Sequence, residues 1–295
     1  MKHLSEIHMR DPFVYVCKEE KKYYLYGTTD EDPWKKAGVG FSVYVSVDLE
    51  WWEGPHVVFT PDQGFWGTHN FWAPEVHAYK NAYYMFASFK AENRCRGTHI
   101  LISNSLLGPF VPLSENPVTP KEWECLDGTF FLDEENQSWI VFCHEWVQVN
   151  DGQICAQRLS EDLLRPIGRP ELLFTAGDAL WTKALKRRDG SDIKDARVTD
   201  GPFLHRTKTG KLLLLWSSIS QNGYALGIAT SLSGTLQGPW MQSETPLIDR
   251  DGGHGMVFTT FNGSLLLTLH SPNETPLERV KFFPVKEVGG TLQCL

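Results

Sequence analysis

The chain has 295 residues, of which 41% are hydrophobic and 22% charged, a composition typical of a globular rather than a disordered protein. Its formal net charge of −8 argues against a nucleic acid or an anionic membrane surface as its partner. No apolar run reaches the roughly 18 residues that a membrane-spanning helix needs, so we expect no such helix.

The N-terminal segment and the cysteine content both bear on the cellular compartment. Residues 1–12, MKHLSEIHMRDP, lack the apolar core of a signal peptide. The six cysteines are sparse for this length and form no CxxC pair, so we expect reduced thiols rather than a disulfide framework. Together these features predict a cytoplasmic protein.

One sequence pattern occurs five times along the chain. Each copy has a polar residue beside Gly or Pro, then an apolar strand, a polar turn and a second apolar strand. The copies read, in chain order, RDPFVYVCKEEKKYYLYGTT, APEVHAYKNAYYMFASF, LDGTFFLDEENQSWIVFCH, VTDGPFLHRTKTGKLLLLWSS and GHGMVFTTFNGSLLLTLHS. The polar residues that we take as markers are Asp11, Glu75, Asp127, Asp200 and His254, at spacings of 64, 52, 73 and 54 residues.

The segments that follow these copies also repeat. FSVYVSVDLEWWEGPHVVF, THILISNSLLGPFVPL, ICAQRLSEDLLRPIGRPELLF and YALGIATSLSGTLQGPWMQS each contain an alternating strand, a short loop and another strand. Strand alternation with Gly and Pro turns predicts an all-β fold, and no long stretch of helical periodicity competes with it. Two hairpins per unit make a four-stranded sheet. Five such sheets predict a five-bladed β-propeller, a single domain over residues 1–295.

Propeller geometry gives the five markers a common location. If each marker begins the innermost strand of its blade, all five project toward one end of the central channel. Four carboxylates and one histidine around a single axis would then form an acidic pocket. The alternative is that each marker is only a turn residue, because Asp beside Gly or Pro is ordinary turn chemistry.

The five motifs together resemble glycoside hydrolase family 43 and its clan, five-bladed propeller enzymes that cleave arabinofuranosides and xylosides. The matching motifs are RDPFV, FWAPEVH, LDGTFFLDEE, TDGPFL and GGHGMVF, which span about residues 10 to 270. The resemblance implies an inverting mechanism with three acids. In such a mechanism one carboxylate deprotonates water, and a carboxylic acid about 6.5–9.5 Å away protonates the leaving oxygen.

The resemblance also implies a role for each of three aspartates. Asp11 is the general base, Asp127 modulates the pKa of the acid and orients it, and Asp200 stands where the general acid stands. The family usually has Glu before Gly-Pro, whereas this chain has the shorter Asp200. Glu145, in the segment CHEWVQ, is therefore an alternative acid. A cluster of like charges in a dry pocket raises at least one carboxyl pKa, which keeps a proton available near neutrality.

Four further residues are candidates for substrate contact, and each also has a structural interpretation. Trp72 resembles the aromatic pocket wall of the family, although it can equally be a packing residue. Glu75 is the marker of the second repeat, and Arg197 is a candidate for hydroxyl contacts that is not distinguished from a surface charge. His254 resembles a channel histidine that in relatives often contacts a hydrated calcium ion. The resemblance thus implies no required cofactor and an optional structural calcium in the channel; a histidine hydrogen-bonded inside the channel is the alternative.

These expectations lead to an exo-acting α-L-arabinofuranosidase that takes short oligosaccharides. The missing signal peptide favours short substrates, and the chain ends soon after the fifth repeat, without the β-sandwich that family β-xylosidases often carry. A β-xylosidase, a β-D-galactofuranosidase and a non-catalytic sugar-binding propeller stay open as alternatives. A protein-interaction propeller is disfavoured, because regular Trp-Asp or kelch signatures do not occur here. The sequence determines neither the sugar and linkage nor the oligomeric state.

Overall fold

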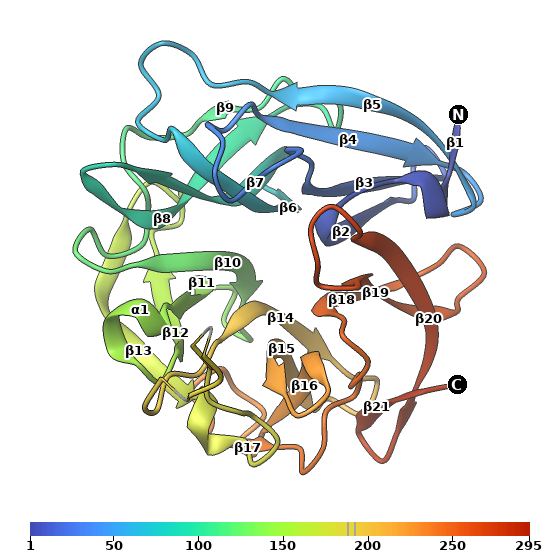
Figure 1. Cartoon of the computed structure of the whole chain (residues 1–295). Coiled ribbons are helices and arrows are strands. Elements are labelled where there is room, and N and C mark those ends of the chain that lie inside the picture. Colours follow the sequence, from blue (N-terminus) through green and yellow to red (C-terminus); the bar gives the residue numbers. More distant parts are fainter. Residues whose placement is uncertain (188, 192) are drawn as a thin grey trace.

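The computed structural model describes residues 1–187, 189–191 and 193–295, and its architecture is a five-bladed β-propeller (Figure 1). Five antiparallel sheets stand around a central axis, with strands β2, β6, β10, β14 and β18 innermost. Helical structure in the described ranges is confined to three short elements, η1 (Leu4–Glu6), α1 (Trp146–Val149) and η2 (Ala176–Asp178). The all-β propeller predicted from the repeats is therefore confirmed.

Each blade is built from strands that follow one another in the chain. The first blade has the order β1 (Lys2–His3), β5 (Trp51–Phe59), β4 (Phe41–Ser46), β3 (Lys22–Thr28) and β2 (Arg10–Cys17). The second contains β6 (His69–Tyr79), β7 (Ala82–Ala91), β8 (Arg94–Ser103) and β9 (Val111–Pro112), and the third contains β10 (Cys125–Leu132), β11 (Ser138–His144), β12 (Gln153–Leu159) and β13 (Pro166–Thr175). The fourth contains β14 (Asp200–Arg206), β15 (Leu212–Ser220), β16 (Gly223–Ser231) and β17 (Trp240–Gln242), and the fifth contains β18 (Gly253–Thr259), β19 (Leu265–Ser271), β20 (Arg279–Val288) and β21 (Thr291–Cys294). The strand β1 at the outer edge of the first blade is the one addition to the predicted four-stranded unit.

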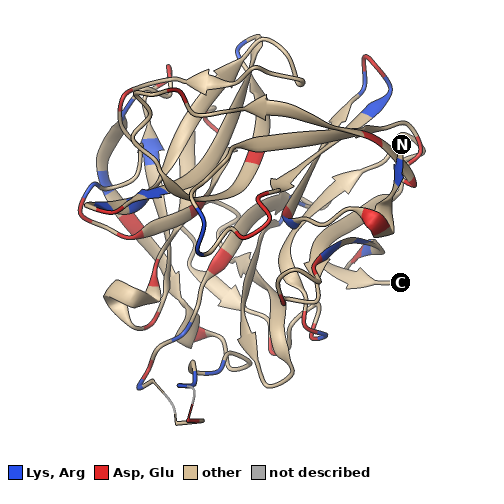
Figure 2. Ribbon diagram, turned by 45° about the horizontal axis from the view of Figure 1, so that its top comes forward, with Lys and Arg blue, Asp and Glu red and all other residues tan. Residues whose placement is uncertain are grey.

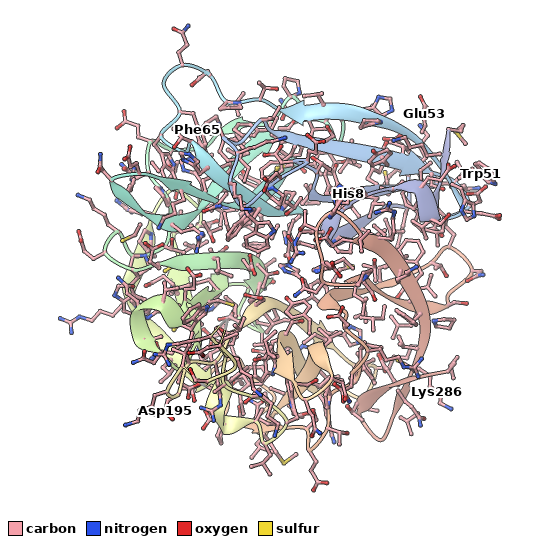
Figure 3. All side chains as sticks on the ribbon, in the orientation of Figure 1. His8, Trp51, Glu53, Phe65, Asp195 and Lys286 are labelled. Atoms are coloured by element: carbon pink, nitrogen blue, oxygen red, sulfur yellow. The ribbon has the colours of Figure 1, made fainter. Side chains whose placement is uncertain are left out.

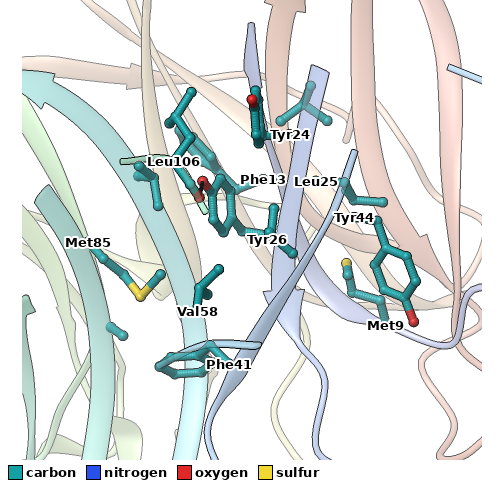
Figure 4. Close-up of a cluster of buried hydrophobic side chains, with 14 of the residues drawn as sticks. Met9, Phe13, Tyr24, Leu25, Tyr26, Phe41, Tyr44, Val58, Met85 and Leu106 are labelled. Atoms are coloured by element: carbon teal, nitrogen blue, oxygen red, sulfur yellow. Dashed lines mark hydrogen bonds between the residues drawn. The ribbon is translucent and has the colours of Figure 1, made fainter. Parts of the chain in front are cut away.

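Apolar side chains fill the spaces between neighbouring blades. Alternation along a strand places side chains on both faces of its sheet, and each face packs against the next blade. Met9, Phe13, Tyr26 and Met85 belong to one such cluster, which joins the first two blades (Figure 4). The buried Tyr26 hydroxyl donates a hydrogen bond of 2.6 Å to the Leu106 carbonyl, so the polar end of this ring is satisfied. This packing holds the inner strands in place around the channel.

An isolated antiparallel bridge between His8 and Arg279 and several side-chain contacts close the ring between the first blade and the last, since no strand of the described chain is shared by these two sheets. The buried carboxylate of Glu278 pairs with Nη1 of Arg10 at 2.5 Å and with Nε2 of His8 at 3.2 Å. Figure 3 labels His8 near this junction. Val280 of β20 packs into the core cluster of the first blade. Arg10 is thereby held directly beside Asp11.

Charged residues are distributed over the surface. In Figure 2, Lys and Arg lie among Asp and Glu residues and do not gather on one basic face. This distribution agrees with the net charge of −8 and gives no support to a nucleic-acid partner. None of the helices in the part of the chain that the structure describes has the length and apolarity needed to span a bilayer.

Candidate active site

The five innermost strands begin with the same backbone irregularity. Each contains a β-bulge near its start, in which one residue has a φ between 48° and 55°. These residues are Asp11, Ala73, Asp127, Gly201 and His254. A positive φ is uncommon outside glycine, so its recurrence in all five blades marks structurally equivalent positions.

This equivalence corrects two of the five markers taken from the sequence. Ala73, not Glu75, corresponds to Asp11 in the second blade, and Gly201, not Asp200, corresponds to it in the fourth. The polar residue stands after the bulge in the motif APE and before it in the motif TDGP. An alignment on polar residues therefore matches Glu75 and Asp200 with Asp11, although their backbone conformations are not equivalent to that of Asp11.

A bulge directs two successive side chains toward the pocket, because it interrupts the strict alternation of a strand. Arg10 and Asp11 both line the pocket, and so do Leu126 and Asp127. In the fourth blade, Asp200 stands directly before the positive-φ residue of the bulge. Arg10 occupies the equivalent position in the first blade. The base and acid candidates thus leave the backbone from non-equivalent positions of two blades.

The pocket at the channel mouth has a volume of about 180 Å³. Six of the eight predicted site residues line it: Asp11, Asp127, Asp200, Glu145, Trp72 and His254. Glu75 does not line the pocket; its buried carboxylate pairs with Nε2 of His77 at 3.1 Å. Arg197 does not either; its backbone bonds to Asn150, and the next residue, Val198, is the one that reaches the pocket. The expectation that Glu75 and Arg197 lie in the pocket is therefore corrected.

Asp11 is held from two sides. Its Oδ2 accepts a hydrogen bond of 2.7 Å from the Thr28 hydroxyl, and its Oδ1 lies 3.2 Å from Nδ1 of His254. Burial by itself would raise the pKa of Asp11. The charge and hydrogen bond of His254 and the Arg10 guanidinium outweigh burial and lower this pKa well below its usual range. Asp11 is consequently ionised at neutral pH, as a group that is to accept a proton must be.

His254 supplies the positive charge of the cluster. Besides its contact with Asp11, its Nδ1 lies 3.6 Å from Oδ2 of Asp127. Burial opposes the charged imidazolium, but the carboxylates of Asp11 and Asp127 raise the pKa of His254 to about 10. The backbone N–H of His254 donates to Oγ of Ser217 at 2.7 Å. An imidazolium is thereby fixed between two carboxylates.

Asp127, which is buried, and Asp200, which is partly exposed, form a pair with raised proton affinity. Burial raises the pKa of both carboxyls and nearby carboxylates add to the rise, although the His254 charge opposes it. Oδ2 of Asp127 accepts the backbone N–H of Gly201 at 3.0 Å, and Oδ2 of Asp200 accepts the Tyr224 hydroxyl at 3.1 Å. Interacting carboxyls titrate as a unit, so the pair retains a proton at a higher pH than an ordinary aspartate does.

Glu145 enters the pocket from the position before α1 and lies against Arg96. The Arg96 guanidinium donates a hydrogen bond to Oε2 of Glu145 and lies 4.4 Å from the centre of the Trp72 ring. Burial raises the pKa of Glu145, and the charge of Arg96 opposes the rise. Glu145 thus has a cation in direct contact, whereas among the described residues the Asp200 side chain bonds to the phenol of Tyr224.

Three tryptophans line the pocket, Trp34, Trp72 and Trp146, and the first two form a continuous wall. The rings of Trp34 and Trp72 meet edge to face with their centres 4.9 Å apart. Nε1 of Trp34 donates a hydrogen bond of 3.1 Å to Oγ1 of Thr275, which ties the loop after β3 to the last blade. Tryptophan presents a large apolar face with one polar N–H, so this wall can cover the apolar face of a sugar ring.

Sequence reasoning missed several pocket residues, among them Arg10, Trp34, Trp146 and Tyr224. Arg10 and Trp146 adjoin predicted site residues in the chain, and this adjacency is a signal that could have found them. Trp34 comes from a loop. Tyr224 comes from the third strand of the fourth blade, where the repeat contains no mark of a site residue.

The described side chains do not fit a directly bound calcium ion. Calcium takes about six to eight oxygen ligands, commonly from carboxylates. In the described ranges, no group of three or more His, Cys, Asp or Glu side chains is arranged to hold a metal ion. The Nδ1 atom of His254 faces Asp11 and Asp127, and its raised pKa makes it a charged donor. A calcium ion held through water molecules stays a prediction.

Comparison with known proteins assigns this chain to a family. The model described as "Glycosyl hydrolases family 43" matches residues 4–283, nearly the whole chain. The chain belongs to glycosyl hydrolase family 43. This family 43 protein is accordingly a glycosidase that hydrolyses O-glycosyl bonds with inversion, and its substrates are carbohydrates.

Solved structures agree with this assignment. An endo-arabinase from Bacteroides thetaiotaomicron VPI-5482 is 40% identical to the family 43 chain, with 98% of each chain covered and a TM-score of 0.90. A thermostable family-43 glycoside hydrolase is 26% identical, with 97% of this chain and 92% of that chain covered and a TM-score of 0.81. An α-L-arabinofuranosidase from Lactobacillus brevis shares the fold at 15% identity and a TM-score of 0.74, with 99% of this chain and 97% of that chain covered. Among curated proteins, no match to this chain was found.

Proposed function

We propose that this family 43 enzyme is an exo-acting α-L-arabinofuranosidase that removes terminal sugars from short oligosaccharides. The observation that carries the exo-acting mode is the size of the acidic pocket, about 180 Å³ beside a wall of tryptophans. Sites for drug-sized ligands occupy roughly 300–1,000 Å³, so this pocket suits one sugar unit rather than a longer chain segment. A cytoplasmic location stays a prediction.

Asp11 is the general base in this proposal. Its ionised carboxylate takes a proton from a water molecule on one face of the terminal sugar, and the water oxygen attacks the anomeric carbon. Thr28 and His254 hold the carboxylate in one orientation while it does so. Inversion requires the acid to act from the opposite face. The first and fourth blades, which carry Asp11 and Asp200, are not neighbours in the ring.

Asp200 is the general acid, and Tyr224 decides which of its oxygens carries the proton. The Tyr224 hydroxyl already donates to Oδ2, so the transferable proton resides on Oδ1. This proton moves to the leaving oxygen as the glycosidic bond breaks, and the remaining carboxylate keeps the hydrogen bond from Tyr224. The neighbouring Asp127 is the modulator in this proposal, because it titrates together with Asp200 and its Oδ2 holds the backbone N–H of Gly201, the residue that follows the acid.

Glu145 is a hydroxyl-binding residue in this proposal rather than the acid. The Arg96 guanidinium in contact with it favours the ionised carboxylate, which can only accept hydrogen bonds. The Trp72 ring packs against the same guanidinium. Glu145 therefore offers a fixed acceptor to a sugar hydroxyl at the edge of the tryptophan wall.

One comparison favours a second candidate function. The endo-arabinase at 40% identity suggests cleavage inside an arabinan chain rather than at its end. This mode needs a cleft that admits sugar units on both sides of the scissile bond. β-Xylosidase and β-D-galactofuranosidase activities use the same acids and stay as alternatives in the choice of sugar.

A substrate panel under one set of conditions tests these candidates. It contains nitrophenyl α-L-arabinofuranoside, β-D-xyloside and β-D-galactofuranoside together with linear arabinan and arabino-oligosaccharides. We expect cleavage of the arabinofuranoside and release of arabinose alone from the oligosaccharides. Early formation of a ladder of shorter oligosaccharides from arabinan would overturn the exo mode. Preferential cleavage of another glycoside would reassign the sugar, and a folded protein inactive on the whole panel would favour the non-catalytic sugar-binding alternative.

A further inference from the structure

Four of the five bulges are held by the same kind of hydrogen bond between neighbouring blades. In each, the backbone N–H of the positive-φ residue donates to a side chain on the second strand of the preceding blade. The donor and acceptor pairs are Ala73 with Thr28 (2.9 Å), Asp127 with Ser88 (2.8 Å), His254 with Ser217 (2.7 Å) and Asp11 with His270 (3.1 Å).

The strand register shows that these acceptors occupy equivalent positions. Each acceptor faces the residue before the bulge of its own blade, and the pairs are Thr28 with Arg10, Ser88 with Trp72, Ser217 with Asp200 and His270 with Gly253. Burial lowers the pKa of His270 to about 4, so its imidazole is neutral and Nδ1 can accept as the hydroxyls do. The bond is therefore a recurring device of this fold.

The third blade departs from this rule. The equivalent residue of its second strand is Cys143, which faces Leu126 in the register and is completely buried. A thiol sulfur is a weak acceptor. By the rule of the other blades, the backbone N–H of Gly201 would donate to residue 143. It donates instead to Oδ2 of Asp127 at 3.0 Å. Since Gly201 directly follows Asp200, the carboxylate of Asp127 holds the bulge that carries the proposed acid.

We infer that Cys143 is a positioning residue, because its thiol leaves the Gly201 N–H to Asp127 and thereby couples Asp127 to the backbone of Asp200. The effect on turnover rests on the proposed function, whereas the hydrogen bond itself does not. Cys143 is not among the residues that line the pocket, so it acts through Asp127 rather than on substrate.

A serine at position 143 would restore the acceptor that three other blades supply from a hydroxyl. It would compete with Asp127 for the Gly201 N–H. A backbone N–H stabilises the ionised form of a carboxylate, so its loss would raise the pKa of Asp127 and release the orientation of its side chain. Both changes disturb the pair formed with Asp200.

The first test compares two substitutions at the same position. Cys143→Ser should lower kcat on an arabino-oligosaccharide by about tenfold, as expected for one hydrogen bond to a charged group, and should move the pH–rate profile with little change in KM. Cys143→Ala offers no acceptor and should therefore keep a higher kcat than Cys143→Ser. Size alone would predict the opposite order, because serine is closer to cysteine in size than alanine is. Cys155→Ser places a hydroxyl at another buried cysteine, on β12, and should leave the pH profile in place. A Cys143→Ser enzyme at least as active as Cys143→Ala, with an unmoved profile, would overturn the inference.

The second test does not depend on turnover. Asp127→Ala removes the present acceptor of the Gly201 N–H, and adding Cys143→Ser should then raise Tm by roughly 2–4 °C. The same serine in the wild-type background should give no such gain. Equal effects of the serine in both backgrounds would refute the competition between residues 143 and 127. A gain confined to the Asp127→Ala background supports it even if no glycoside of the panel is cleaved, in which case the proposed function fails and the inferred contact stands.

Discussion

The Tyr224 hydroxyl donates a hydrogen bond of 3.1 Å to Oδ2 of Asp200, while the Tyr224 ring stacks on His270 with centres 5.6 Å apart. His270 in turn accepts the backbone N–H of Asp11 at 3.1 Å. A short chain of contacts thus runs from the proposed acid to the proposed base. The two groups that we propose act on opposite faces of the sugar are positioned by one shared frame.

Tyr224→Phe tests the part of this frame that orients the acid. The variant loses the donor to Oδ2, so the proton of Asp200 is no longer confined to Oδ1, and kcat on oligosaccharides should fall roughly 10- to 100-fold. The loss should be smaller on dinitrophenyl glycosides, whose leaving groups need little protonation. Equal losses on both substrates, measured at matched pH, would show that Tyr224 serves substrate binding or packing instead.

The choice of acid between Asp200 and Glu145 is tested by leaving-group dependence. Asp200→Asn should lose activity strongly on natural oligosaccharides and much less on nitrophenyl or dinitrophenyl glycosides, because a good leaving group departs without a proton. Glu145→Gln should weaken both substrates alike and mainly raise KM. The opposite pattern in steady-state kinetics would move the acid to Glu145.

Asp11→Asn tests the base. Asparagine keeps the shape of the side chain but cannot accept a proton from water, so kcat should fall by about 10²–10⁴-fold or more. Sugar binding should change little and serves as the control, whereas Tm should fall at neutral pH, because asparagine removes the charge that faces His254. Proton NMR of the first product of the wild-type enzyme should show the inverted anomer. Near-normal turnover by Asp11→Asn would remove this residue from the mechanism.

The raised pKa of His254 predicts a loss of stability at alkaline pH. A group whose pKa is raised in the folded state stabilises the fold fully below its ordinary pKa, for histidine about 6.5, and this contribution is lost as pH rises through about 10. Asp11 has a lowered pKa, so its contribution is present above the ordinary aspartate pKa and is lost only in acid. We expect His254→Asn to lower Tm at pH 6 and to have a much smaller effect at pH 10. An equal loss of Tm at both pH values would contradict an imidazolium at this site.

Chelation tests the role of calcium. Because the described side chains form no cage and His254 carries the positive charge, dialysis against EDTA should leave both kcat and Tm unchanged. Magnesium and calcium are then added back separately as controls. A loss that calcium alone restores would show that the channel holds the ion through water molecules.

The architecture could be predicted because the repeat is local. Each strand pair and its turn lie together in the chain, so apolar alternation and Gly or Pro turns reveal the hairpins, and five copies reveal the blades. The placement of Asp11, Asp127 and His254 also follows from the repeat, because each is the positive-φ residue of its bulge. The same reasoning misplaced Glu75, since a polar residue two positions after a bulge looks like one at the bulge.

By itself, the sequence determined the five-bladed fold and the family, because both depend on local patterns and on the order of motifs along the chain. Only the tertiary structure decided which residue of each motif reaches the pocket. A bulge changes the side of the sheet to which the following side chains point, and the apolar–polar alternation of the sequence does not reveal where a bulge occurs. It also decided the partners of the acids. Tyr224 lies opposite Asp200, Arg96 opposite Glu145 and Cys143 behind the bulge of the next blade. Such contacts join segments that are far apart in the chain, and the pKa values they set depend on burial and charge that exist only when the ring is closed.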